Sequence, residues 1–154
     1  MRTQEWLEQR LNEIWELHFK DIERKNKIIV KFRGKSRYKF GHIRLLKDKS
    51  TEIAINSLFK NLEIPQFMID LTIAHELVHY MHGFQSPHPK MFKYPHQGGI
   101  VNKELKKRGF SLMLKQYKNF VKNDWKNTYL KITPPPKRRI KTRKYSLLRF
   151  LLSK

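Results

Sequence analysis

The stretch of sequence that decides the fold is residues 65–81, which read PQFMIDLTIAHELVHYM. Apolar side chains recur there at intervals of four, three, four and three residues, at Phe67, Leu71, Ala74, Val78 and Met81. This spacing is the period of an α-helix with one apolar face, and proline is suited to the first turn of a helix. The pattern therefore predicts a central, buried helix with Pro65 in its first turn.

The same helix carries the pattern H-E-x-x-H, as His75-Glu76-Leu77-Val78-His79. Residues four apart lie on one face of a helix, about one turn from each other, so His75 and His79 can bind a single metal ion. Zinc is the metal that such pairs typically hold, and we expect one ion per chain. Glu76 would lie beside the open coordination position, where a carboxylate can act as general base toward water. This machinery suits peptide hydrolysis.

A catalytic zinc usually has three protein ligands, so a third is needed. His82 lies only one turn beyond His79 on the same helix, and we expect it at the surface or beside the site instead of on the metal. It also occupies the position where the metzincin pattern needs glycine, which excludes that class. The remaining candidates are His88, His96 and Glu104.

Upstream of this helix, the pattern predicts one more helix and three short strands. Residues 3–24 carry apolar side chains at helical spacing, with Thr3 as a cap, and the helix is expected to end near residues 25–26. Strands are expected over residues 28–32, 38–46 and 52–56, with a turn at residues 34–36. The fold class is therefore α+β with a small sheet.

Downstream, residues 85–97 contain three prolines and are expected to form a loop. Two helices are expected over residues 98–108 and 110–125, separated by Gly109. We divide the chain into one folded domain, residues 1–130, and a basic tail, residues 131–154, that begins with a run of three prolines.

Charge is distributed unevenly along the chain. Of 154 residues, 34 are Lys or Arg and 13 are Asp or Glu, which makes the formal net charge +21. Residues 1–76 contribute +4 of this and residues 77–154 contribute +17. Six cations cluster directly after the three prolines, within residues 137–144: Lys137, Arg138, Arg139, Lys141, Arg143 and Lys144. This pattern predicts an arm that neutralises phosphates, with DNA that is single-stranded or distorted as the expected partner.

The composition excludes several classes of protein. There is no cysteine, which rules out disulfide scaffolds, thiolate metal sites and cysteine nucleophiles, so any metal must be held by His and carboxylate. No stretch approaches the ~18 apolar residues of a membrane span. We expect an intracellular soluble protein, cytoplasmic and nucleoid-associated, or nuclear in a eukaryote. The oligomeric state cannot be read from these patterns.

The order of these features resembles the SprT-like zinc metallopeptidases. The resemblance covers roughly residues 3–110. Its elements are a Trp-rich first helix, a strand hairpin carrying Gly41, a strand ending in Ile55-Asn56, the H-E-x-x-H helix, a variable loop, and Pro95-His96 opening a helix that ends in Leu105-Lys106-Lys107-Arg108-Gly109-Phe110.

The resemblance implies a zincin-like core with His75, His79 and His96 as zinc ligands and Glu76 as the catalytic acid and base. It implies a zinc-dependent metalloendopeptidase whose substrates are proteins or peptides. Some members of this family degrade proteins crosslinked to DNA. Together with the basic second half of the chain, this points to DNA-associated or DNA-crosslinked proteins as the substrates here.

Two departures from the family pattern bear on the third ligand and on the tail. The family usually has glycine directly after the third histidine and an aromatic residue four positions after it, whereas His96 is followed by Gln97 and, at the fourth position, Ile100. His88 matches that detail better, but Pro95 then interrupts the helix that should follow. The cysteine ribbon that some relatives carry is missing, and basic helices and the tail take its place.

Two other functions fit the same residues. The first is a basic nucleic-acid-binding protein with a structural or vestigial metal site. An intact Glu76 argues against it, because a structural site needs no general base. The second is a metal hydrolase of the YgjP-like type that acts on a substrate other than a peptide.

Overall fold

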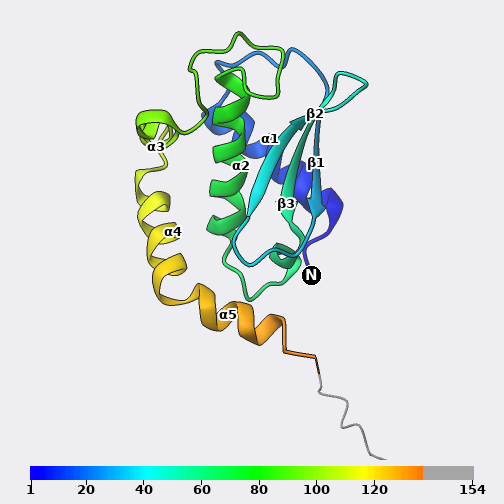
Figure 1. Cartoon of the computed structure of the whole chain (residues 1–154), viewed down its shortest axis with the longest axis vertical. Helices are drawn as coiled ribbons and strands as arrows, with labels where there is room; N and C mark the ends of the chain where they lie inside the picture. The colour runs from blue at the N-terminus through cyan, green and yellow to red at the C-terminus, as the bar shows by residue number, and fades with distance from the viewer. Residues whose placement is uncertain (137–154) are drawn as a thin grey trace, which may run out of the picture.

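Helices and a small sheet make up the part of the chain that the structure describes, residues 1–136 of a computed structural model (Figure 1). In chain order its elements are α1 (Gln4–His18), β1 (Ile28–Arg33), β2 (Gly41–Leu45), β3 (Thr51–Asn56), the short 3-10 helix η1 (Ser57–Lys60), α2 (Gln66–Met81), the short 3-10 helix η2 (Gln97–Gly99), α3 (Ile100–Lys107), α4 (Ser111–Asn123) and α5 (Trp125–Ile132). This arrangement confirms the α+β class.

The sheet has the strand order β1-β3-β2. β3 pairs in parallel with β1 and in antiparallel with β2, so the hairpin that carries Gly41 is formed by β2 and β3. The turn expected at residues 34–36 therefore does not join neighbouring strands. Glu52 of the central strand is buried and pairs with Arg33 of β1 and Arg44 of β2, at 2.9 and 3.2 Å. These two ion pairs join both outer strands to the middle one.

The first helix begins as expected but ends earlier than residue 24. The hydroxyl of Thr3 accepts a hydrogen bond from the Trp6 N–H at 3.1 Å, which is an N-cap. The last helical residue is His18, and Phe19, 1% exposed, turns into the core. The chain leaves helical geometry at Phe19, whose φ and ψ are −129° and 19° and whose N–H donates to the Trp15 carbonyl.

Helix α2 is the central element, as its periodicity predicts. Twelve of its sixteen residues are buried. It contacts α1, α3, α4, β2 and β3, while α1 packs mainly against β1. Because α2 is enclosed on nearly all sides, the polar side chains that it carries are held in fixed positions inside the fold.

The helices after the proline-rich loop run along α2 and then past the end of the sheet (Figure 1). Gly109, with a φ of 91°, forms the predicted break between α3 and α4. A further helix, α5, was not predicted, and the expected domain boundary at residue 130 falls inside it. Trp125 begins α5, is 5% exposed and donates its indole N–H to the Arg37 carbonyl at 2.9 Å.

Candidate metal centre

Three histidines from two parts of the chain converge at the C-terminal half of α2. His75 and His79 lie one turn apart on α2, and His96 comes from the end of the proline-rich loop. The Nε2 atoms of the three rings are 3.1 Å apart in each of the three pairs. Among the described residues, this is the group of side chains that can hold a metal ion.

His96 is held in place by the start of α3. It immediately precedes η2, where Gly98 and Gly99 adopt positive φ angles of 58° and 67° and turn the chain into α3. Buried Val101 and Leu105 then pack this helix against the core. The third imidazole is therefore fixed by a packed helix, although the loop before it has no regular structure.

The three rings fit a metal ion. Neutral imidazoles can share an N–H···N hydrogen bond in pairs, but three mutually close ring nitrogens leave lone pairs facing one another. A tetrahedral zinc ion with Zn–N distances of 2.0–2.1 Å has its ligand nitrogens about 3.3 Å apart, close to the observed spacing. The donor set therefore suits a cation of this kind.

The electrostatics of the site also favour metal binding. Burial lowers the pKa of His75 to about 4 and that of His79 to about 3, because low-polarity surroundings disfavour the imidazolium, and the neighbouring imidazoles lower both values further. Both rings are neutral at pH 7. Only the neutral ring has a free lone pair for a metal.

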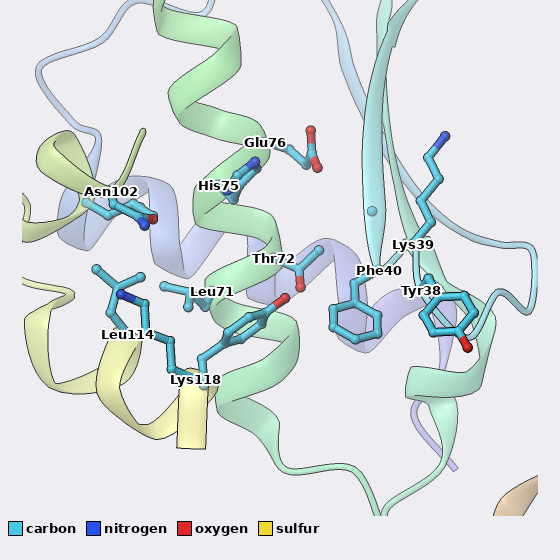
Figure 2. Close-up of a pocket in the computed structure, with 13 residues that line it drawn as sticks. Tyr38, Lys39, Phe40, Leu71, Thr72, His75, Glu76, Asn102, Leu114 and Lys118 are labelled. Atoms are coloured by element: carbon cyan, nitrogen blue, oxygen red, sulfur yellow. The ribbon is translucent and has the colours of Figure 1, made fainter. Parts of the chain in front are cut away.

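Glu76 lies beside this cluster and points from α2 toward the sheet (Figure 2). It is 5% exposed and makes no hydrogen bond through its side chain to any residue in 1–136. Burial raises its pKa to about 7, and the positive charge of Lys39 partly opposes the rise. A Cβ at Gly41 would stand 3.2 Å from Glu76 Oε1 and 2.6 Å from Thr72 Cγ2, so strand β2 approaches the carboxylate closely only because residue 41 is glycine.

The other candidate ligands lie elsewhere. His88 Nε2 is 2.8 Å from the carbonyl oxygen of Glu23. Glu104 pairs with Arg108 at 2.9 Å. Of the three candidates for third ligand, His96 is therefore the one that the structure brings to His75 and His79.

Of the two positions expected for His82, at the surface or beside the site, the surface position is wrong. It is 3% exposed and its ring packs against Phe92 at 4.9 Å, so it is buried beside the loop instead of lying at the surface. The Nδ1 atoms of His82 and His79 are both buried without a hydrogen-bond partner among the described residues.

A cavity of about 390 Å³ opens beside His75 and Glu76 (Figure 2). Four structural elements form its walls. They contribute Tyr38, Lys39, Phe40 and Gly41 in and before β2, Leu71, Thr72, His75 and Glu76 on α2, Asn102 and Leu105 on α3, and Leu114, Tyr117 and Lys118 on α4.

Most of these cavity residues were missed by sequence reasoning. Phe40 is far in the chain from Leu114 and Tyr117, and each of the three is part of an ordinary apolar pattern. Burial and the charge of Glu76 raise the pKa of Tyr117 to about 12, which reflects its position near the carboxylate. No local signal identifies such residues, because the fold alone brings them together.

The predicted DNA contacts cannot be placed in the same way. Lys137, Arg138, Arg139, Lys141, Arg143 and Lys144 lie outside the described residues. Within residues 1–136, no helix combines the length and the apolarity needed to cross a membrane.

A scan against protein-family models, a search of curated proteins and a search of solved structures find no match to this chain. An inference of function therefore starts from the geometry of the three histidines, Glu76 and the adjacent cavity.

Proposed function

We propose that this protein is a zinc-dependent endopeptidase. The observation that carries the proposal is the meeting of His75, His79 and His96 at mutual Nε2 distances of 3.1 Å, directly beside the buried carboxylate of Glu76. A site that served only to hold the fold together would need no such carboxylate at its side. An adjacent cavity provides room for a substrate.

The chain's own residues would divide the work as follows. The three imidazoles would hold the ion, which when bound polarises a carbonyl and lowers the pKa of water toward ~7. Glu76 would accept a proton from the attacking water and deliver it to the leaving nitrogen of the peptide. The absence of a hydrogen-bond partner within residues 1–136 leaves this carboxylate free to do so.

A peptide substrate is favoured by the position of β2. Within the described residues this strand pairs with β3 on one side only. On its other edge the Leu45 N–H donates to Gln85 Oε1 at 2.9 Å, so the part of that edge before Leu45 is available to an extended chain. The edge passes Glu76 at Gly41, where the backbone comes closest to the carboxylate. A peptide lying along β2 would therefore pass the three histidines.

The decisive experiment replaces the general base. We expect Glu76→Gln to retain one zinc per chain by elemental analysis and to lose casein cleavage by about 10²-fold or more, because an amide cannot accept the proton. Glu16→Gln, at an exposed carboxylate of α1, is the matched control and should cleave like the parent. Equal cleavage by the Glu76→Gln variant and the parent would remove Glu76 from the mechanism.

We also infer that the substrates are proteins associated with DNA. Helices α3 to α5 carry eight lysines, all exposed: Lys103, Lys106, Lys107, Lys115, Lys118, Lys122, Lys126 and Lys131. Among these, and within the described residues, only Lys131 forms an ion pair, with Glu63 at 2.8 Å. Such a set of free cations attracts phosphates.

Salt dependence tests this inference. The affinity for a single-stranded oligonucleotide should fall with log salt at a slope of about −0.7 for each neutralised phosphate. Truncation after Pro136 should flatten the slope if the tail makes the contacts, and Lys→Gln changes on α3 to α5 should flatten it if the helices do. Absence of binding at low salt would refute DNA as a partner.

A further inference from the structure

The cavity beside the three histidines has rigid apolar walls. Leu71, Leu105 and Leu114 are each at most 5% exposed and belong to the main core. The ring of Phe40 is fixed by Phe59, at a centroid distance of 5.3 Å, and by other rings of the core. Because these side chains are held by packing on their far sides, the cavity is formed in advance.

Away from its mouth, the polar side chains of the cavity are His75, Glu76 and Tyr117. The Thr72 hydroxyl donates to the Met68 carbonyl at 2.6 Å, so this residue uses its polar atom within the helix. Lys39, Asn102 and Lys118 line the cavity but are exposed, which puts them at its mouth. The remaining walls are therefore apolar, and the rim is cationic.

The position of the cavity suits one side chain of a substrate, and its size leaves room for a large one. A volume of about 390 Å³ lies at the lower end of the range for ligand sites, ~300–1,000 Å³. Two of the lining residues are His75 and Glu76, so an occupant would contact the groups that act on the scissile bond. A side chain adjacent to that bond is the group that reaches such a place.

We propose that this cavity is a specificity subsite that takes a large apolar side chain, preferably an aromatic ring, from the residue next to the bond that is cut. This inference rests on the proposed peptidase function. Lys39 and Lys118 at the rim disfavour lysine and arginine at the same position of the substrate, because like charges repel.

Binding can be measured without cleavage in the Glu76→Gln variant. The probes are octapeptides of alternating Ser and Gly with one central residue, Phe, Leu, Ala or Lys. By calorimetry, we expect the Phe peptide to bind about tenfold or more tightly than the Ala peptide, since it buries a ring, and the Lys peptide to bind most weakly. Equal affinities for all four peptides would overturn the inference.

Two substitutions that fill the cavity test whether it is the cavity that selects the Phe side chain. Leu114→Trp fills it from the wall, and Asn102→Trp fills it from an exposed position that does not disturb the core. Both should abolish the preference for Phe while zinc content remains one ion per chain. Leu112→Trp is the matched control, because Leu112 lies on α4 like Leu114 but is 69% exposed and outside the cavity. A preference that survives Asn102→Trp would show that another surface selects the side chain.

The same peptides separate this inference from the proposed function. If the parent cleaves none of them but still binds Phe preferentially, the cavity does select an aromatic ring, and the peptidase proposal fails together with the place of that ring beside a cut bond. If the parent cleaves all four equally well, the peptidase stands and the subsite fails. If a single-stranded oligonucleotide binds the parent and loses its affinity in Asn102→Trp, the cavity takes a nucleobase and the inference is wrong.

Discussion

The two halves of α2 each bury a carboxylate, but only the carboxylate in the first half has a hydrogen-bond partner among the described residues. Asp70 is 3% exposed and accepts two hydrogen bonds from the guanidinium of Arg10, at 2.6 and 2.8 Å. Glu76, six residues later and 5% exposed, has no hydrogen-bond partner within residues 1–136. Burial of a charge without a partner costs free energy, so chains retain it where the group serves a reaction.

The same contrast holds beyond this helix. Glu52 at the centre of the sheet is buried and paired with two arginines, whereas His79 is buried with an unpartnered Nδ1. The buried carboxylates Asp70 and Glu52 of the scaffold are thus paired with arginines, whereas Glu76 and the Nδ1 atom of His79 at the candidate metal centre have no partner among the described residues. Three changes test this difference between the paired groups of the scaffold and the unpaired groups of the candidate metal centre. The first should have the largest effect and the last the smallest.

Metal removal should destabilise the protein most. At a free zinc concentration a thousand times the dissociation constant, binding to the native state contributes about 4 kcal/mol. For a chain of this size, chelation should lower the melting temperature by roughly 8–16 °C in calorimetry. The double variant His75→Ala/His79→Ala should melt at the same temperature with and without chelator. An equal response of the parent and the double variant would place the metal elsewhere.

Removing each carboxylate of α2 should separate stability from activity. In metal-free protein, Asp70→Asn should cost about 2–3 kcal/mol in urea unfolding, because it removes the carboxylate that accepts two hydrogen bonds from Arg10 and leaves that guanidinium only its ion pair with Glu13. Glu76→Gln should raise the free energy of unfolding by about 1–3 kcal/mol at pH 8, since no contact is lost and the cost of burying the carboxylate, whose pKa is raised to about 7, is removed. Cleavage should be little changed in Asp70→Asn and lost in Glu76→Gln. A similar stability loss for both variants would mean that Glu76 is a scaffold residue.

Gly41→Ala should have a smaller effect, at the contact between strand and carboxylate. The new methyl group would meet Thr72 Cγ2 at 2.6 Å, and the crowding should cost about 1–3 kcal/mol. Adding Thr72→Ser removes that methyl from α2 and keeps the hydroxyl, so the double variant should recover much of the loss. Thermal unfolding of the two single variants and the double variant measures the coupling. Strict additivity would show that the two groups do not meet.

Local sequence patterns were sufficient for the elements that depend on neighbouring residues. The period of apolar residues identified α2 as the buried central helix, and the spacing of His75 and His79 placed their imidazoles on one face. The cap at Thr3 and the break at Gly109 were also predicted, because each depends on one residue's hydrogen bonding or backbone freedom. Helical spacing and capping are short-range properties that the sequence displays directly.

The tertiary structure decided what depends on distant residues. Helix α1 ends where Phe19 enters the core, and the separate helix α5 begins where Trp125 enters the core. The place of β3 between β1 and β2 depends on pairing across the sheet, which no local pattern contains.

In the candidate site, too, some features follow from local sequence and others only from packing between distant segments. By itself, the sequence determined that two histidines and a glutamate share one helix, since the period of the helix fixes their spacing. Only packing of α3 against α2 brought His96, and not His88 or Glu104, to the other two histidines. Only the meeting of α2, α3, α4 and β2 formed the cavity beside Glu76, because its walls come from segments that are separate in the chain and adjacent in space.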